Sequence, residues 1–176
     1  MPQTVWSTAI AEAYAFAPSD VVILHTLELS HIAFADGPIR VVLNTEDIQA
    51  RIEATAQLNA NQVVTFLRCR FDFTLPPITE DAAPEIVIAI DNVDRRILKN
   101  VELAVDQSDP ITVIYRPYLS NDLLAGPHMN PPLKMEIRTI EGNQFRVTAR
   151  ATIGDISNRV FPSTEYTGTR FPGLAR

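Results

Sequence analysis

The side chains that could do chemistry in this chain are few and scattered. A cysteine–histidine nucleophile would need Cys69, the single cysteine, within hydrogen-bond reach of His25, His31 or His128. Cys69 falls on the apolar face of a predicted strand, where a free cysteine packs as a small hydrophobic side chain. His25 falls on the inward face of another predicted strand. We therefore interpret both residues as parts of the core.

Acidic, histidine and glycine residues show no spacing typical of a metal site or a common catalytic motif. Asp91 and Asp94 flank a turn and resemble a carboxylate pair, but helix capping and local pairing with Arg95 are the better interpretation. Glu46 and Asp47 have no second acidic cluster at the spacing of a calcium loop. The sequence has no H-E-x-x-H pair, phosphate-binding glycine loop or G-x-S-x-G motif. We predict no enzyme, no cofactor and no bound metal.

Length and composition predict a single soluble domain with a sizeable core. The chain has 176 residues, 46% of them hydrophobic, and its 13 prolines against 6 glycines favour strands joined by proline-containing loops. A net charge of −6 argues against nucleic-acid binding, general or sequence-specific, because phosphates need a basic surface. One cysteine excludes an intrachain disulfide. We expect no signal peptide and no membrane insertion, since Glu12 interrupts the apolar N-terminal pattern and long apolar runs are missing.

Residues 84–119 carry the strongest pattern, and the other elements must be arranged around them. Residues 85–90 are apolar at nearly every position, which predicts a central strand covered on both faces. Residues 95–105 place apolar side chains, Ala104 among them, at helical spacing, which predicts a short helix packed on the sheet. Residues 111–119 are predicted to form a second strand.

Periodicity divides the rest of the chain into further elements. Thr4 is predicted to cap an N-terminal helix that has Trp6, Ile10 and Tyr14 on one face, lies on the domain or on a neighbour, and ends at Ala17-Pro18. Residues 44–61 are interpreted as another helix. The remaining predicted strands are 21–30, 39–43, 62–75, 133–140 and 144–153. The first two and the last two of these strands are predicted to form hairpins.

Alternation within these strands predicts which side chains enter the core. In strand 21–30 the odd-numbered residues face inward, and the other face becomes polar at Thr26 and Glu28. In strand 62–75 the odd-numbered apolar residues face inward from residue 67 onward. In the last hairpin the inward positions begin at Leu133 and Phe145.

Two segments without periodicity are candidates for contact with other molecules. Residues 120–132 have the composition of a loop, and 154–176 form a polar arm with two Phe-Pro pairs. The candidate subunit-contact residues in them are Asn121, His128, Met129, Phe161, Pro162, Tyr166, Phe171, Pro172 and Leu174. We predict a mainly β domain at 1–153, with a β-sandwich or split-barrel core, an N-terminal helix and a short internal helix, followed by an extended C-terminal arm at 154–176.

Three stretches of sequence resemble a known family. They are Ser30-His31 with 38–44 and Asp47-Ile48, the run IVIAIDNVDRRI at 86–97, and the end of the chain from Phe161-Pro162 through Phe171-Pro172-Gly173-Leu174. Together they resemble a family of tailed-bacteriophage proteins of uncharacterised status, encoded among the tail-tip genes downstream of the tape-measure gene. The chain differs from that family at 49–61, which is longer than the usual link into the next strand.

The resemblance implies a non-enzymatic structural component of a siphovirus-like tail tip, present in the virion and assembled in the bacterial host cytoplasm. Such distal tail or baseplate proteins form rings between the tail tube and the hub. The implied partners are further copies of the chain, with a hexamer favoured over a trimer, together with the tube, the hub and other tail-tip proteins. Two alternatives stay open. One is a host-surface or carbohydrate-binding tip module, which would expose aromatic side chains; the other is an accessory cell-wall hydrolase.

Overall fold

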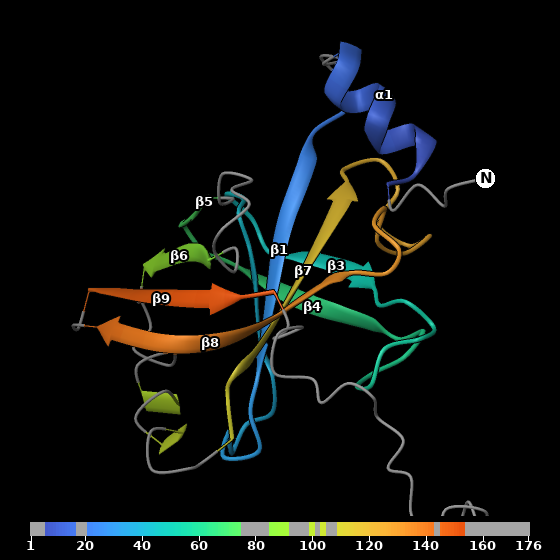
Figure 1. Ribbon diagram of the computed structural model, residues 1–176. Helices are drawn as coiled ribbons and strands as arrows, with labels where there is room; N and C mark the ends of the chain where they lie inside the picture. Colours follow the sequence, from blue (N-terminus) through green and yellow to red (C-terminus); the bar gives the residue numbers. More distant parts are fainter. Residues whose placement is uncertain are drawn as a thin grey trace, which may run out of the picture.

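The computed structural model describes residues 6–16, 21–74, 85–91, 99–100, 103–104, 109–142 and 145–153. Within these ranges the chain is mainly β, as predicted, with one mixed nine-stranded sheet and one helix, α1 (Thr8–Phe16) (Figure 1). The strands are β1 (Ile23–Ser30), β2 (Ile39–Val42), β3 (Ile48–Arg51), β4 (Val63–Arg68), β5 (Phe71–Thr74), β6 (Glu85–Asp91), β7 (Thr112–Leu119), β8 (Leu133–Gly142) and β9 (Arg146–Thr152). Their order across the sheet is β3-β4-β2-β1-β7-β8-β9-β6-β5.

Both predicted hairpins and the predicted central strand are present. β1 pairs antiparallel with β2, and β8 pairs antiparallel with β9. β6 pairs with β5 on one side and β9 on the other, and its residues Ile86, Ile88 and Ile90 are buried. The prediction that both faces are covered is wrong at Val87, which is 40% exposed. Of the predicted helix at 95–105 the described residues include Ala104, which has helical backbone and is buried in the core.

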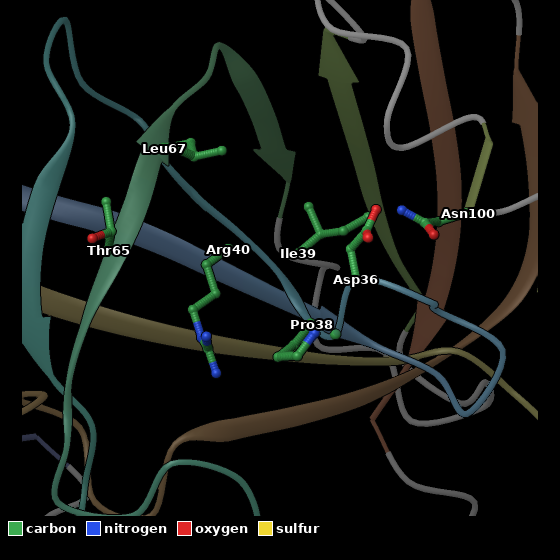
Figure 2. Close-up of a pocket in the computed structure, with 8 residues that line it drawn as sticks. Asp36, Pro38, Ile39, Arg40, Thr65, Leu67 and Asn100 are labelled. Atoms are coloured by element: carbon green, nitrogen blue, oxygen red, sulfur yellow. The ribbon is translucent and has the colours of Figure 1, made fainter.

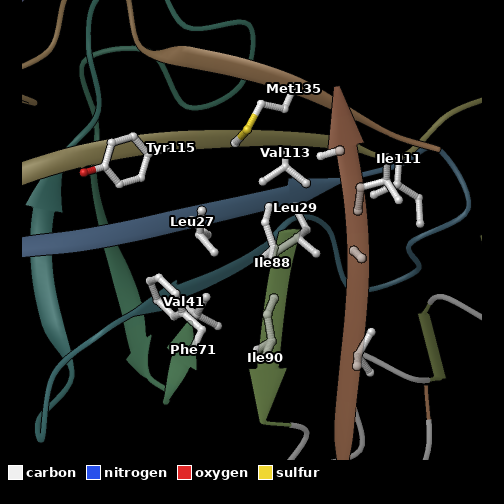
Figure 3. Packing of buried hydrophobic residues seen from close by; sticks show 14 of the residues in the cluster. Leu27, Leu29, Val41, Phe71, Ile88, Ile90, Ile111, Val113, Tyr115 and Met135 are labelled. Carbon is white, nitrogen blue, oxygen red and sulfur yellow. The ribbon is translucent and has the colours of Figure 1, made fainter. Parts of the chain in front are cut away.

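The two faces of β1 and β7 supply side chains to two different cores. Leu27 of β1 and Tyr115 of β7 belong to the larger cluster, which also takes residues from β2, β5, β6, β8 and β9 (Figure 3). Leu24 and Tyr118, on the opposite faces of the same strands, belong to a second cluster with residues from β2, β3 and β4. This pair of strands is therefore buried on both sides, as expected for strands between two layers of apolar side chains.

Burial on both faces overturns the prediction of a polar outer face on β1. Thr26 and Glu28 are completely or almost completely buried. The hydroxyl of Thr26 donates to the carbonyl oxygen of Arg116 at 2.7 Å, and Glu28 forms ion pairs with Arg40 and Arg116. Buried polar groups persist where each finds such a partner. The partners come from distant parts of the sequence, so alternation within β1 could not reveal them.

The predicted helix at 44–61 is wrong. Its N-terminal part contains strand β3, and Asn59 and Asn61 adopt left-handed backbone conformations with φ of 54° and 57°. Such conformations end any regular helix, and asparagine tolerates them better than most residues. Ile48 and Ile52 are four residues apart, which suits a helix, but both also fit period-two alternation with the buried Ala50 between them.

The predicted strand at 62–75 is divided, and its faces change at the division. β4 and β5 are separated by Cys69 and Arg70. Phe66 is fully buried in the second cluster, whereas Phe71 is buried in the larger one, so the buried positions change from even to odd between the two strands. Phe145 was also assigned to the wrong environment: it precedes the first residue of β9 and is 73% exposed. Faces predicted by alternation hold only while a strand continues without a break.

The link between β4 and β5 connects strands from opposite regions of the sheet order. The amide of Cys69 donates to the carbonyl oxygen of Val42 in β2 at 2.9 Å. The amide of Asp91 in β6 donates to the carbonyl oxygen of Arg70, also at 2.9 Å. Because two linked residues contact β2 and β6 in turn, the sheet must curl strongly for both bonds to form.

Candidate functional site

The members of the cysteine–histidine pair that we considered and set aside lie in separate contacts. The Cys69 thiol donates to the carbonyl oxygens of Asp91 at 3.3 Å and Arg70 at 3.6 Å, and the residue is half-buried against the larger core. Nδ1 of His25 is 2.7 Å from the Tyr115 hydroxyl, and Nε2 of His31 donates to the carbonyl oxygen of Asp109 at 3.0 Å. These bonds occupy the groups that a cysteine–histidine pair would need.

His128, one of the candidate contact residues, joins the 120–132 loop to the start of α1. The amide of Ser7 donates to the carbonyl oxygen of His128 at 2.9 Å, and the Ser7 hydroxyl lies 3.0 Å from Nδ1 of His128. The Ser7 hydroxyl also accepts a hydrogen bond from the amide of Ile10 at 3.3 Å. Ser7 therefore caps the helix, which begins at Thr8, and the prediction of Thr4 as the cap is wrong.

Ser7, His128 and Asp122 form a hydroxyl–imidazole–carboxylate set that superficially resembles a hydrolytic triad. Nε2 of His128 is 4.0 Å from Oδ2 of Asp122, too long for a hydrogen bond. The serine contacts Nδ1 rather than Nε2, the reverse of the triad arrangement, and its hydroxyl already accepts the bond that caps α1. The geometry favours a structural clamp between the helix and the loop over a nucleophile.

Helix α1 exposes apolar side chains beside this clamp. Ile10 and Ala13 are buried against Leu119, but Tyr14 is 55% and Phe16 is 81% exposed. Tyr14, predicted to share one face with Ile10, is therefore not packed on its own domain as Ile10 is, and packing of this face on a neighbour stays a prediction. Trp6, predicted to share that face, is 38% exposed, stacks edge-on against Tyr14 and bridges Met129. The partly exposed rings of Trp6 and Tyr14, which are in edge-to-face contact, form an aromatic surface that we call the α1 surface.

The nine candidate contact residues differ in their surroundings. Asn121 is exposed in the loop, whereas His128 and Met129 are half-buried and held by Ser7 and Trp6 of the same chain. The other candidates, Phe161, Pro162, Tyr166, Phe171, Pro172 and Leu174, lie outside the described residues. Sequence reasoning missed the α1 surface because Trp6 and Tyr14 recur at the same spacing as the buried Ile10.

An aromatic and polar cluster lies between α1 and the larger core. Tyr115 stacks on Phe73, with ring centroids 5.0 Å apart, and its hydroxyl contacts His25. Burial and the neighbouring, hydrogen-bonded Tyr14 hydroxyl raise the pKa of Tyr115. Burial also lowers the pKa of His25 below its ordinary value of 6.5. Both groups are therefore held in their neutral forms near neutral pH.

Titration of His25 is expected to weaken the fold in mild acid. Below pH 6.5 the unfolded chain binds a proton that the folded chain resists. The contribution of His25 to the free energy of unfolding should therefore be constant above pH 6.5. The free energy of unfolding should fall as the pH drops below 6.5. Urea unfolding at several pH values between about 5.5 and 7.5 measures the slope. The His25→Phe variant should have a shallower slope; equal slopes for His25→Phe and wild type would contradict this assignment.

A buried ionic cluster stabilises the opposite face of β1 and β7. Arg116 donates from Nε and Nη2 to the two carboxylate oxygens of Glu53, at 2.7 and 2.9 Å, and its Nη1 is 3.4 Å from Glu28. Nε of Arg40 donates to Glu28 at 2.5 Å, and its Nη2 donates to Asn59 at 2.6 Å. Burial alone would lower the pKa of Arg116, but the adjoining carboxylates outweigh burial and raise it. The cluster balances two guanidinium groups with two carboxylates, although Nη1 of Arg116 is buried without a hydrogen-bond partner; this balance of charge suits a structural role.

A pocket of about 500 Å³ opens beside this cluster, between β2 and β4. The apolar part of its lining consists of Pro38, Ile39 and Leu67. The polar part consists of Asp36, Arg40, Thr65 and Asn100. Figure 2 shows the polar side chains of Asp36 and Asn100 pointing towards each other across it. Its size is in the range of sites that bind small molecules or peptide segments.

Comparison with known proteins identifies the family. A family model described as a domain of unknown function, DUF1833, matches residues 9–166. The chain belongs to the DUF1833 family. No curated protein matches the chain. The family description names no activity, so the function has to be argued from the residues and their arrangement.

The DUF1833 match spans the ionic cluster, the pocket and the 120–132 loop, while Trp6 and Ser7 of the clamp precede it. Among the described residues, no group of three or more histidine, cysteine or acidic side chains is placed to hold a metal ion. In the same part of the chain, no helix has the length and apolar character needed to cross a membrane.

Proposed function

We propose that this DUF1833 protein is a non-enzymatic structural component of a bacteriophage tail tip. It forms a ring that connects the tail tube to the hub, it resides in the virion, and it assembles in the host cytoplasm. The observation that carries the proposal is the resemblance of three stretches, spread over most of the chain, to tail-tip proteins. The partners are further copies of the chain, with a hexamer favoured over a trimer, and the tube, hub and other tail-tip proteins.

Two features of the described residues support a role as a ring subunit. The core is buried between strands that are far apart in the sequence, which gives a rigid domain. The α1 surface leaves Tyr14 more than half exposed, and its Trp6 forms a backbone bridge with Met129 of the 120–132 loop. Exposed aromatic groups that gather in one place are typical of protein–protein contacts. We assign an additional contact of the ring subunit to this region, beside the contact that residues 154–176 supply.

We also infer that the nine-stranded sheet is a split barrel. Hydrogen bonds from the β4–β5 link reach Val42 in β2 and Asp91 in β6, which brings distant strands of the sheet order together. Closure in this way removes most of the exposed strand edges that promote uncontrolled association. A ring subunit benefits from such closure because its contacts are then limited to chosen surfaces.

A carbohydrate-binding tip module is the second candidate, and the α1 surface is the observation that favours it. Trp6 and Tyr14 are partly exposed and in edge-to-face contact, and exposed aromatic rings can stack on sugars. Binding of host cell-wall saccharides that Trp6→Ala abolishes, with a monomeric protein, would favour this reading. An accessory cell-wall hydrolase has less support, because the Ser7 hydroxyl serves as a helix cap.

The native mass of the purified chain tests the ring. The full chain should form a closed oligomer over a wide concentration range, and the chain ending at Ile153 should be monomeric, because residues 154–176 supply the contact. Analytical ultracentrifugation of both proteins measures this difference. Unfolding curves of the two should coincide if the loss reflects the contact alone. A full chain that stays monomeric at every concentration would argue against self-assembly and favour the sugar-binding alternative.

A further inference from the structure

We propose that the pocket between β2 and β4 is an acceptor site for an extended peptide strand, and that residues 163–170 of a second copy of this chain occupy it. The inference rests on the proposed function, since it requires copies of the chain side by side. It names the acceptor surface of that contact and the segment that binds there.

The two strands that border the pocket pair with each other over a short length. β2 and β4 are parallel, and Val41 pairs with Leu67 and Val42 with Arg68. Towards Ile39 and Thr65 the two strands instead line the pocket (Figure 2). On their other sides β2 pairs with β1, and β4 pairs with β3. Among the described residues, each strand therefore has an edge towards the pocket that is not paired with another strand.

Such edges are the structural requirement for strand addition. Backbone N–H and C=O groups along an open edge pair with an extended peptide, and adjoining pockets hold its alternate side chains. The edge of β3 is less suited to this role, because the amide of Arg51 already donates to the carbonyl oxygen of Leu123 at 3.0 Å. The pocket also offers both kinds of lining that a mixed peptide needs, an apolar wall at Pro38 and Ile39 and the exposed carboxylate of Asp36.

Residues 163–170 have the composition of such a strand. Their sequence is STEYTGTR, with four hydroxyl-bearing or aromatic β-formers and no proline, although prolines stand on either side at Pro162 and Pro172. Tyr166 supplies a ring for the apolar wall, and Arg170 supplies a cation for Asp36. Prolines at both ends would limit the pairing to this stretch, because proline lacks the backbone donor.

The length of the C-terminal segment allows it to reach a neighbour. Residues 154–176 follow Ile153, which packs against the larger core of its own chain. An extended chain spans about 3.3 Å per residue, so the stretch up to residue 166 alone reaches about 40 Å. That reach exceeds twice the radius of gyration of about 16 Å expected for a domain of this size. A pocket on an adjacent subunit is therefore within reach.

The test uses the full-length chain and three variants. Thr65→Trp fills the pocket from an exposed position of β4, and Tyr166→Ala removes the ring that would enter it. Val63→Trp is the matched control, since Val63 is an exposed residue of the same strand and does not line the pocket. Hydrogen exchange of amides 163–170, native mass and the unfolding midpoint are measured for each protein.

We expect wild type and Val63→Trp to be oligomeric, with exchange of amides 163–170 slowed at least about tenfold. Thr65→Trp and Tyr166→Ala should lose both the oligomer and the slowed exchange, while still unfolding cooperatively, with midpoints lowered only by the stabilisation that the oligomer supplies. Oligomers that persist in Thr65→Trp with slow exchange would overturn the acceptor site and leave the ring intact. A monomeric wild type overturns the second copy as the occupant. If amides 163–170 of that monomer exchange slowly and lose this protection in Thr65→Trp, the pocket binds the chain's own segment. If these amides exchange fast in every protein, the pocket site and the ring are both rejected.

Discussion

Replacing Arg116 by methionine is expected to lower the free energy of unfolding by about 3–5 kcal/mol. Arg116 is fully buried and holds Glu53 by two hydrogen bonds while facing the buried Glu28. Methionine fills similar space but carries no charge. Glu28 would keep Arg40, at 2.5 Å, but Glu53 would lose the cation that compensates its carboxylate. Leaving one member of a buried ion pair without its partner is among the costliest single changes.

Arg146→Met provides the matched control for Arg116→Met. Arg146 donates to Asp72 at 2.6 Å, but the side chains of this pair are 49% and 71% exposed. Water solvates the exposed Asp72 carboxylate after the change, so the expected loss is below about 1 kcal/mol. Urea unfolding followed by circular dichroism measures both variants. If Arg116→Met cost no more than Arg146→Met, the buried cluster would have no structural role.

Ile88→Asp is expected to abolish folding. Ile88 lies in the middle of β6, is 1% exposed and packs in the larger core (Figure 3). The change removes a large apolar contact, worth about 1.5–3 kcal/mol, and introduces a carboxylate that needs a partner or water. The sum is comparable to the whole stability of a typical domain, about 5–15 kcal/mol. Circular dichroism and one-dimensional NMR of the purified variant should show an unfolded or aggregated chain.

Val87→Asp is the control for Ile88→Asp on the neighbouring position of the same strand. Val87 is 40% exposed, so its replacement carboxylate stays in contact with water. We expect a folded protein that has lost about 1 kcal/mol, chiefly through the lower strand propensity of aspartate. A soluble Ile88→Asp protein that melts cooperatively would mean that β6 is not a central strand of the core.

The two pairs of variants also separate stability from the proposed assembly. Arg116 and Ile88 are buried within one chain, so their replacement should act on folding before it acts on oligomerisation. Replacement of Thr65 or Tyr166 should instead act on oligomerisation before it acts on folding. A comparison of unfolding midpoints and native masses across the variants therefore distinguishes a failed subunit from a failed contact.

Local pattern was enough to predict the strands whose side chains alternate without interruption. The hairpin of β8 and β9, with Met135 and Val147 facing inward, was predicted because each inward position depends only on neighbours within its strand. The mainly β class and the central position of β6 followed from the same kind of signal. The proposed tail-tip role likewise rests on the sequence, through its resemblance to tail-tip proteins.

Tertiary structure alone decided the features that join distant segments. Arg116 and Glu53 are 63 positions apart and Ser7 and His128 are 121 apart, so no window of sequence contains both members of either pair. Contacts between distant segments also explain why the polar face of β1 is buried. They likewise explain why residues 48–51, whose spacing fits helix and strand alike, form a strand. The sequence by itself determined the strands that alternate; the curling of the sheet determined which polar residues became buried, because burial depends on the segments that the fold brings together.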